Sequence, residues 1–249
     1  MKRTPTAAGL LVSMPGPVRE FGAYFGILGA SLASFAQFFR PPVRSVLYRQ
    51  IYFTGLEPLL KMAMVSLFMG AAVITQITVL FGLNTEILGK VLLWTVLREL
   101  GPLLTAMLVI ARSGVAVTAE LAAMKVAGEI RLIELMGINP FNYLIVPRVA
   151  GMILSLMLLT VYLQAAAVFG GLLLCDPLLD VPVQKTLTSL VASATLGDIF
   201  LSLTKSALFG GVIGAIVCYQ GVSVTGAITQ IPQATIKAVM RSFLAVFIL

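Results

Sequence analysis

Long stretches without a charged residue alternate with short polar segments along this chain, a pattern typical of helices that cross a membrane. About 20 apolar residues in a row are enough to span the hydrocarbon core of a bilayer. The stretch Ile199–Ile236 carries only Lys205 and is too long for one helix, so we expect a break near Gly221–Gln233, which contains Gly226 and Pro232. The predicted spans are Met62–Thr85, Leu100–Ala119 with Arg112 inside it, Val149–Cys175, a fourth from Ile199 to about Gly221, and a fifth from about Thr235.

The stretch Phe21–Phe39 is also uncharged and long enough to cross, and two interpretations of it stay open. If it crossed, the three basic residues before it would move to the outer side. A helix lying in the inner leaflet therefore fits the distribution of basic residues better. The predicted organisation is one membrane domain, 1–249, with a cytoplasmic and interfacial segment at 1–58 followed by a helical bundle at 59–249.

The composition indicates an all-α integral membrane protein. Hydrophobic residues make up 59% of the chain and charged residues 11%, whereas a soluble domain has about 45–50% and 25%. The chain has no histidine, which excludes Ser-His and Cys-His catalysis, imidazole metal sites and His-ligated haem. Cys175 and Cys218 lie in separate apolar stretches and form no CxxC motif, so we expect them to pack in the core rather than to bind a metal.

The basic residues predict the orientation of the chain in the membrane. If the N-terminus is cytoplasmic, the inner segments 1–61, 112–148 and 221–241 hold 13 of the 17 Lys and Arg residues, and the outer segments 83–98 and 176–198 hold 3. Cytoplasmic loops carry an excess of Lys and Arg, so we expect this orientation, and the net charge of +7 does not indicate nucleic-acid binding. We expect no signal peptide, because the first 19 residues lack an apolar core followed by a small-residue cleavage site.

The segment 98–148 carries charges at membrane depth, where an ionisable group costs about 2.5–3.5 kcal/mol and usually marks function. The informative elements are Arg98-Glu99-Leu100-Gly101-Pro102, Arg112, Ala119-Glu120-Leu121, Met124-Lys125-Val126, Glu134, Met136-Gly137, Pro140 and Pro147-Arg148. In order and spacing the segment resembles the permease family of the bacterial Mla and Mce lipid transporters (the MlaE/YrbE type), which has a chloroplast-envelope counterpart.

The resemblance implies five transmembrane helices after an N-terminal interfacial elbow helix, in the bacterial inner (cytoplasmic) membrane. It implies an ABC-transporter permease that moves phospholipids or related lipids between that membrane and a periplasmic MCE-domain lipid-binding protein, which maintains outer-membrane lipid asymmetry. The other implied partners are a second permease copy and two ATPase subunits, and a STAS-type accessory subunit is a further candidate. No GxxxxGK[ST] string occurs, so we expect this chain to be no enzyme and to hold no cofactor, with ATP and Mg in the partner subunit.

Two groups of residues are candidates for a lipid pocket. Arg98 and Glu99, at the predicted outer end of span two, either reach interfacial water or, as the resemblance implies, line the polar mouth of a lipid cavity between two permeases. The planar fork of an arginine can meet a phosphate. In span one, Gln76 forms either an interhelical hydrogen bond or a headgroup contact. The residues that approximately share its face, and are candidates to line an acyl-chain pocket, are Val73, Ile77 and Leu80.

A short amphipathic helix at about 124–138 is the candidate coupling helix that docks in the partner ATPase, and an ordinary cytoplasmic connector is the alternative. Where relatives have Glu-Gln-Ile-Asp, this chain has Gly128-Glu129-Ile130-Arg131. We therefore expect an altered charge complementarity, and we expect Gly128 to weaken the helix by up to about 1 kcal/mol. The candidate coupling residues are Lys125, Glu129, Ile130, Arg131, Glu134, Met136 and Gly137.

Four further charged residues are candidates for structural ion pairs with neighbouring helices. Arg112 and Glu120 lie eight residues apart on one helix face, and a direct transport role is the weaker alternative for them. Asp198 and Lys205 lie seven apart on one face of span four, and a functional role is equally open for this pair.

Two other functions remain as alternatives to an ABC permease. A secondary transporter or channel working alone is expected to show inverted repeats and acids at mid-membrane, but five spans do not divide into equal halves. An intramembrane enzyme would need catalytic groups, and the chain has neither histidine nor paired mid-membrane aspartates.

The predicted last span is short. From Thr235 it would be about 22 Å long at 1.5 Å per residue, less than the roughly 30 Å of the hydrocarbon core. The last span of the resembled family runs further and carries an acidic residue, so we expect either a truncated chain or an incomplete span.

Overall fold

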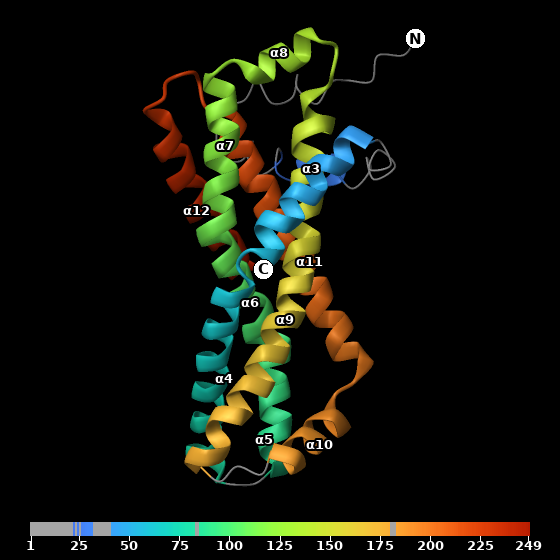
Figure 1. The fold of residues 1–249 in the computed structure, drawn as a ribbon, viewed down its shortest axis with the longest axis vertical. Helices are drawn as coiled ribbons and strands as arrows, with labels where there is room; N and C mark the ends of the chain where they lie inside the picture. The colour runs from blue at the N-terminus through green and yellow to red at the C-terminus, as the bar shows by residue number, and fades with distance from the viewer. Residues whose placement is uncertain (1–21, 23, 25, 32–40, 83–84, 180–182) are drawn as a thin grey trace. The chain divides into compact units, whose positions relative to one another are not determined.

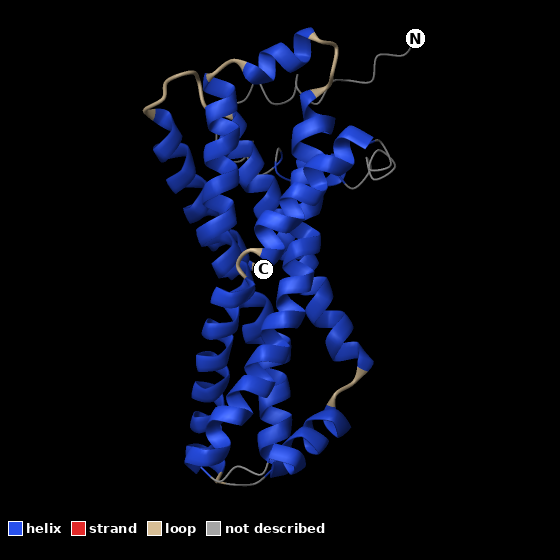
Figure 2. Ribbon diagram, viewed as in Figure 1, coloured by secondary structure: helices blue, strands red, loops and turns tan. Residues whose placement is uncertain are grey.

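The computed structural model describes residues 22, 24, 26–31, 41–82, 85–179 and 183–249, and within these ranges it contains helices and loops but no strand (Figures 1 and 2). The predicted all-α class is confirmed. The α-helices are α3 (Pro41–Ile51), α4 (Leu59–Phe81), α5 (Thr85–Leu92), α6 (Gly101–Val109), α7 (Val115–Val126), α8 (Glu129–Leu135), α9 (Val146–Leu179), α10 (Val183–Ser193), α11 (Leu196–Val222) and α12 (Gln230–Ile248). Wider π-helical turns form η2 (Tyr52–Leu56), η3 (Leu93–Leu100), η4 (Ile110–Gly114) and η5 (Phe141–Ile145).

Five helical stretches in the described part are long and apolar enough to cross a membrane, which confirms the predicted number of spans. They are Ser45–Phe81, Ile87–Val126, Phe141–Asp176, Leu196–Val222 and Gln230–Ile248. Most of the predicted interfacial helix Phe21–Phe39 lies outside the described residues, although 26–31 are helical.

The second span begins earlier than predicted, and this changes the place of Arg98 and Glu99. The segment expected to be an outer loop, 83–98, is largely helix, because α5 continues through η3 into α6. Leu88, Leu92 and Val96 follow one another at intervals of four residues and are fully buried, so one side of this stretch packs like any amphipathic helix. Arg98 and Glu99 therefore lie within a helix and not at its outer end.

The segment 176–198, also expected to be an outer loop, contains the end of α9 and the whole of α10. Thr186 and Leu190 of α10 are buried one turn apart, and α10 packs along α5 (Figure 1). The amphipathic pattern of this helix is too short to stand out in the sequence beside the much longer apolar spans.

The fifth span also begins earlier than predicted. The side-chain carbonyl Oε1 of Gln230 accepts hydrogen bonds from the backbone N–H and the hydroxyl of Thr225, both at 3.0 Å, and α12 starts at Gln230. Its 19 residues correspond to about 28 Å, close to the thickness of the hydrocarbon core. Lys237 and Arg241, which the orientation argument assigned to an inner loop, lie inside α12.

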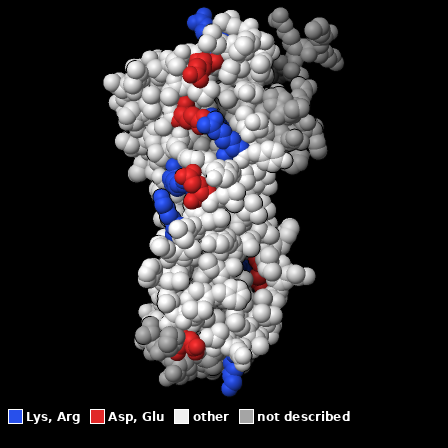
Figure 3. All heavy atoms as spheres, in the orientation of Figure 1, with Lys and Arg blue, Asp and Glu red and all other residues white. Residues whose placement is uncertain are grey.

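The chain divides into two compact units by its internal contacts. Unit 1 comprises Met1–Thr54, Val109–Leu154 and Phe209–Leu249, and unit 2 comprises Gly55–Leu108 and Ser155–Leu208. Uncharged atoms cover most of the face in Figure 3, where several acidic and basic side chains lie next to one another.

In unit 2, the helices α4, α5, α9 and α10 meet in one apolar cluster. Gly70 of α4 lies directly against the backbone of Ala167 on α9, so the absence of a side chain lets the two helices approach closely. The buried members of the cluster are Ile74, Ile77, Leu88, Leu92, Val96, Ala167, Val168, Leu172, Cys175 and Leu190.

In unit 1, α11 packs through glycines against α7 and the first turns of α9. A Cβ atom at Gly221 would lie 2.7 Å from Cβ of Leu121, and one at Gly214 would lie 3.1 Å from Cα of Val149. The hydroxyl of Thr118 donates to the Gly114 carbonyl at 2.9 Å. α7 also packs against α12, and the buried residues at the α8 end of this contact are Ala122, Val224 and Ala234.

The contact at Gly70 gives a test of the fold. We expect Gly70→Ala to destabilise the protein by about 2 kcal/mol, because the added Cβ would collide with the Ala167 carbonyl oxygen and a backbone must move. Thermal melting of the purified protein in detergent measures this. Gly197→Ala is the matched control, since a Cβ there meets only the Thr195 hydroxyl at 3.5 Å. Equal melting temperatures for the two variants would contradict the close α4–α9 contact.

Candidate functional site

Pro102 interrupts the backbone hydrogen bonds of the second span next to Arg98 and Glu99, the residues predicted to line the lipid mouth. Pro102 has no backbone N–H. In a π-helical turn that N–H would reach the carbonyl of Leu97, and in an α-helical turn it would reach that of Arg98. The backbone runs in the wider register here, because the N–H of Gly101 bonds to the carbonyl of Val96. Pro102 thus withholds one N–H that would otherwise serve either of these two carbonyls inside an apolar span, where an unpaired carbonyl is costly.

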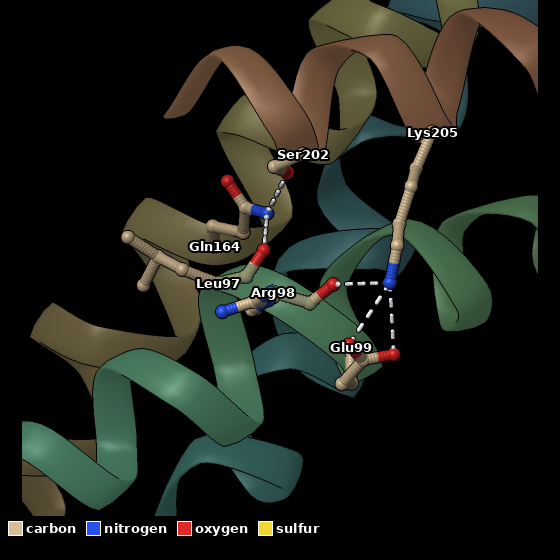
Figure 4. A network of polar contacts seen from close by, with 6 residues as sticks. All are labelled: Leu97, Arg98, Glu99, Gln164, Ser202 and Lys205. Atoms are coloured by element: carbon tan, nitrogen blue, oxygen red, sulfur yellow. Dashed lines mark hydrogen bonds and ion pairs between the residues drawn. The ribbon is translucent and has the colours of Figure 1, made fainter. Parts of the chain in front are cut away.

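Side chains from two other helices supply donors to these carbonyls (Figure 4). Nε2 of Gln164, on α9, donates to the Leu97 carbonyl at 2.7 Å and also lies 2.7 Å from the Ser202 hydroxyl. Nζ of Lys205, on α11, donates to the Arg98 carbonyl at 3.3 Å. Three helices of unit 2 are therefore joined at the point where Pro102 interrupts the backbone pattern.

An ion pair completes the network. Nζ of Lys205 lies 2.9 and 3.0 Å from the two carboxylate oxygens of Glu99. The side chain of Glu99 is 64% exposed and that of Lys205 is 35% exposed, so the pair is accessible from one side. Arg98 stacks over the ring of Trp94 with 5.0 Å between its guanidinium carbon and the ring centroid. The network thus brings an accessible carboxylate, an ammonium and a guanidinium to one place in unit 2.

Gly101 makes room for this arrangement. A Cβ atom at this position would lie 2.7 Å from both Cγ and Nε2 of Gln164. The residue string Arg98-Glu99-Leu100-Gly101-Pro102 therefore has a physical explanation within this chain. Its glycine leaves space for the amide of Gln164, its proline lacks the backbone N–H that would bond to a carbonyl of the preceding turn, and its acid binds Lys205.

The predicted acyl-chain residues of span one do not share one environment. Ile77 is buried in the unit 2 cluster and Val73 packs against that cluster. Gln76 and Leu80 lie on the exposed side of α4, and the Gln76 amide makes no hydrogen bond with a described residue. The structure thus brings Arg98, Glu99 and Lys205 together. On α4 it places Val73 and Ile77 on the cluster side and Gln76 and Leu80 on the exposed side.

The predicted coupling segment forms a short helix with a defined beginning and end. Gly128 has φ of +77°, precedes α8 and belongs to the connection from α7, so the expected weakening of the helix by this glycine is wrong. Gly137 has φ of +76°, with hydrogen bonds from its N–H to the Glu134 carbonyl and from Ile138 to Ile133. This pair of bonds is the Schellman motif, in which glycine readily adopts the left-handed conformation.

The exposed surface of α8 and of the residues next to it combines charged side chains with large apolar ones. Ile130 is buried, whereas Leu135 and Met136 are 77% and 68% exposed. The other predicted coupling residues, all of them charged and exposed, are Lys125, Glu129, Arg131 and Glu134.

A buried arginine holds the two helices that flank α8. Nη2 of Arg148, at the start of α9, lies 2.9 Å from Oε1 of Glu120 on α7, and it also lies 4.0 Å from Sδ of Met124. The Arg148 side chain is 5% exposed and that of Glu120 is 53% exposed. Nη1 of Arg148 has no hydrogen-bond partner among the described residues, so this ion pair leaves the buried guanidinium only partly compensated.

The remaining charged candidates have separate surroundings. Arg112 donates to the Phe53 carbonyl at 3.1 Å and stacks over the Phe53 ring. Asp198 accepts from the N–H and the hydroxyl of Thr195, and its own N–H donates to that hydroxyl. This reciprocal arrangement is a capping box at the start of α11. Asp198 and Lys205 thus have different partners.

Sequence reasoning missed Gln164 and the role of Arg148. A single amide inside the uncharged stretch Val149–Cys175 was the available signal, because polar side chains in spanning helices commonly bond to neighbouring helices. Among the described residues, no group of three or more His, Cys, Asp or Glu side chains is placed to hold a metal ion.

Comparison with known proteins identifies the family. A model of the permease MlaE family matches residues 47–249, most of the chain. The chain belongs to the MlaE permease family. The matched region contains the Arg148–Glu120 pair, α8 and the polar network beside Pro102, so all three are features of an MlaE-family permease. We call this network the Pro102 network, and its members are Leu97, Arg98, Glu99, Gln164, Ser202 and Lys205.

Several curated relatives agree with this. The chain is 32% identical over 203 residues to the chloroplastic Protein TRIGALACTOSYLDIACYLGLYCEROL 1 of Arabidopsis thaliana, covering 80% of this chain and 58% of that protein. A probable ABC transporter permease protein of Rickettsia conorii is 30% identical over 88% of this chain and 85% of its own length. One of Synechocystis sp. is 35% identical over 68% of this chain and 64% of its own length.

The uneven exposure of Arg148 and Glu120 gives an asymmetric prediction. We expect Glu120→Gln to destabilise the protein by about 3 kcal/mol, because it leaves a buried charge unpaired. Arg148→Met should cost less, because the remaining Glu120 carboxylate is half exposed, and adding Glu120→Gln to it should cost little more. Thermal melting of the three variants tests this, with Glu129→Gln on exposed α8 as the control. A more severe effect of Arg148→Met than of Glu120→Gln would contradict the description of this pair.

Proposed function

We propose that this chain is the membrane-spanning permease subunit of an ABC transporter that moves lipids. The match of residues 47–249 to the MlaE permease family carries the proposal. The five helices able to span a membrane agree with it. The sequence has no P-loop, so a separate ATPase subunit binds ATP and Mg, and this chain supplies the path for the lipid.

The Pro102 network supports a lipid as the transported molecule. A phospholipid headgroup carries a phosphate and often a cationic group, and the accessible Glu99, Lys205 and Arg98 offer both charge signs at one place. The apolar surroundings suit acyl chains. The Arabidopsis relative carries the name of a galactolipid, which agrees with a lipid substrate. Phospholipid is the substrate class we propose for this chain.

α8 is the proposed docking element for the ATPase. Its exposed Leu135 and the exposed Met136 that follows the helix offer an apolar contact, and its charged residues can fix the orientation of the ATPase on it. Arg148 and Glu120 tie α7 to α9, so a displacement of α8 by the ATPase would be passed to both flanking helices rather than absorbed by a loose connector.

The proposed assembly contains two permease copies, two ATPase subunits and a periplasmic MCE-domain protein, with a STAS-type accessory subunit as a further member. It lies in the inner membrane with the permease N-terminus in the cytoplasm, in line with the excess of basic residues in the expected inner segments. ATP-driven closure would displace lipid between the permease cavity and the MCE protein. Maintenance of outer-membrane lipid asymmetry is the physiological role we propose.

Native mass spectrometry tests the proposal as a whole. The chain is co-expressed with the proteins encoded beside it and extracted gently. A particle with two permeases, two ATPases and bound phospholipid is the expected result. A chain that carries no ATPase, while transporting a substrate alone after reconstitution, would contradict it and favour a secondary transporter or channel.

Charge reversal tests the Glu99–Lys205 pair. We expect Glu99→Lys and Lys205→Glu each to reduce lipid transfer to reconstituted acceptor protein about tenfold or more, because each places two like charges about 3 Å apart. The double exchange should recover part of the activity. Arg98→Glu should also reduce transfer, through loss of a phosphate-binding group. Full transfer by all the single variants, with assembly unchanged, would remove this network from the mechanism.

Substitutions on α8 test the docking surface. We expect Leu135→Asp to weaken co-purification of the ATPase about tenfold or more, because a charge replaces an apolar contact. Arg131→Glu and Glu134→Lys should weaken it less. Leu196→Ser, at a leucine of α11 that is even more exposed than Leu135, is the control and should have no effect. Unchanged ATPase recovery in all the α8 variants would make α8 an ordinary connector.

A further inference from the structure

Unit 1 contains a pocket that the proposed transport path does not use. It has a volume of about 330 Å³ and lies between the C-terminal end of α11 and the first three turns of α12. This volume is at the lower end of the range of ligand pockets in proteins. We call it the α11–α12 pocket, and its polar lining includes Tyr219, Gln220, Ser223, Gln233, Lys237 and Arg241.

The described lining of the α11–α12 pocket is cationic. Lys237 and Arg241 both belong to it, and none of the other lining residues that the structure describes is acidic. The two residues lie four apart on α12, so they occupy the same face of the helix. The remaining polar lining consists of hydroxyl and amide groups, which can donate hydrogen bonds to an oxyanion.

Of the two cationic residues, Arg241 is held in place by neighbouring polar groups. Nη1 of Arg241 lies 2.9 Å from the hydroxyl oxygen of Tyr24, and Nε2 of the buried Gln220 lies 3.0 Å from the same oxygen. The Tyr24 ring packs edge to face against Tyr219 at 5.1 Å. Arg241 is thus fixed at the edge of the pocket, whereas Lys237 is exposed and makes no hydrogen bond or ion pair with a described residue.

Lys237 and Arg241 both lie within a helix long and apolar enough to span the membrane, where a charged group is costly unless it has a partner or reaches the interface. Lys237 is about 10 Å and Arg241 about 16 Å along α12 from Gln230 at 1.5 Å per residue. Side chains on a helix lean toward its N-terminus, so both cationic groups reach back toward the Gln230 end. Val224 and Ala234, which line the pocket, pack against Ala122 near the end of α7, so the pocket lies near the α8 end of unit 1.

We propose that the α11–α12 pocket binds the phosphate of an anionic lipid headgroup from the leaflet at the α8 end. Basic pockets between spanning helices on the cytoplasmic side bind such headgroups. Lys237 supplies the mobile charge, Arg241 the fixed one, and the amides and hydroxyls the remaining donors. The site is distinct from the Glu99–Lys205 pair of unit 2, and it requires only that the chain lies in a membrane, not that it transports lipid.

Lipid retention measures the proposal directly. The full chain, with the subunits that co-purify with it, is placed in nanodiscs of phosphatidylcholine with or without phosphatidylglycerol, extracted, and weighed by native mass spectrometry. We expect the wild type to retain phosphatidylglycerol in preference to phosphatidylcholine. Lys237→Gln should lower this preference about tenfold, because a charge-assisted hydrogen bond is lost. Lys237→Arg should keep it, and so should the control Lys185→Gln, which removes an exposed charge from α10.

Each outcome decides the proposal. Equal phosphatidylglycerol retention by wild type and Lys237→Gln would overturn it. Thermal stabilisation by inorganic phosphate that requires Lys237, without any preference among lipids, would overturn the lipid source and assign the pocket to free phosphate. Neither lipid transfer nor ATPase association enters the readout, so a negative result leaves the proposed function standing.

Discussion

The missing N–H of Pro102 is the constraint on which the candidate site depends. Within a membrane every backbone carbonyl needs a donor, and here the donors to Leu97 and Arg98 come from Gln164 and Lys205. Each of these side chains has a second contact, with Ser202 and with Glu99 respectively. The polar network is thus a consequence of satisfying the backbone, and its charged residues are positioned by that requirement.

Charged residues inside the spans serve different purposes in the two units. In unit 2 the Glu99–Lys205 pair remains accessible to solvent or ligand. In unit 1 Arg148 is buried and binds Glu120 between α7 and α9. The first arrangement can exchange partners at modest cost, whereas the second cannot, since an unpaired buried guanidinium is strongly unfavourable. The exposed pair of unit 2 is therefore suited to a changing environment, and the buried pair of unit 1 is suited to holding α7 and α9 together.

The number and order of the spans could be predicted from the sequence because apolar length alone decides them. The start of the second span could not, because α5 is amphipathic and its burial against α10 depends on residues about a hundred positions away. The pairing of Lys205 with Glu99 rather than with a group on its own helix also required the fold. Gln164 was visible only as one amide in an apolar stretch, with nothing in the sequence to show that Pro102 was its reason.

Pro102 lacks a backbone N–H, and side chains of two other helices donate hydrogen bonds to the carbonyls beside it. The residue types at positions 102, 164 and 205 therefore depend on one another. A residue with a backbone N–H at position 102 would bond to one of the two carbonyls, and would make the backbone contact of either Gln164 or Lys205 redundant. Conversely, an apolar residue at position 164 would be tolerated only together with such a change. We therefore expect a substitution of Pro102 to be accompanied by a substitution at 164 or 205, because each of these side chains replaces a donor that the backbone lacks.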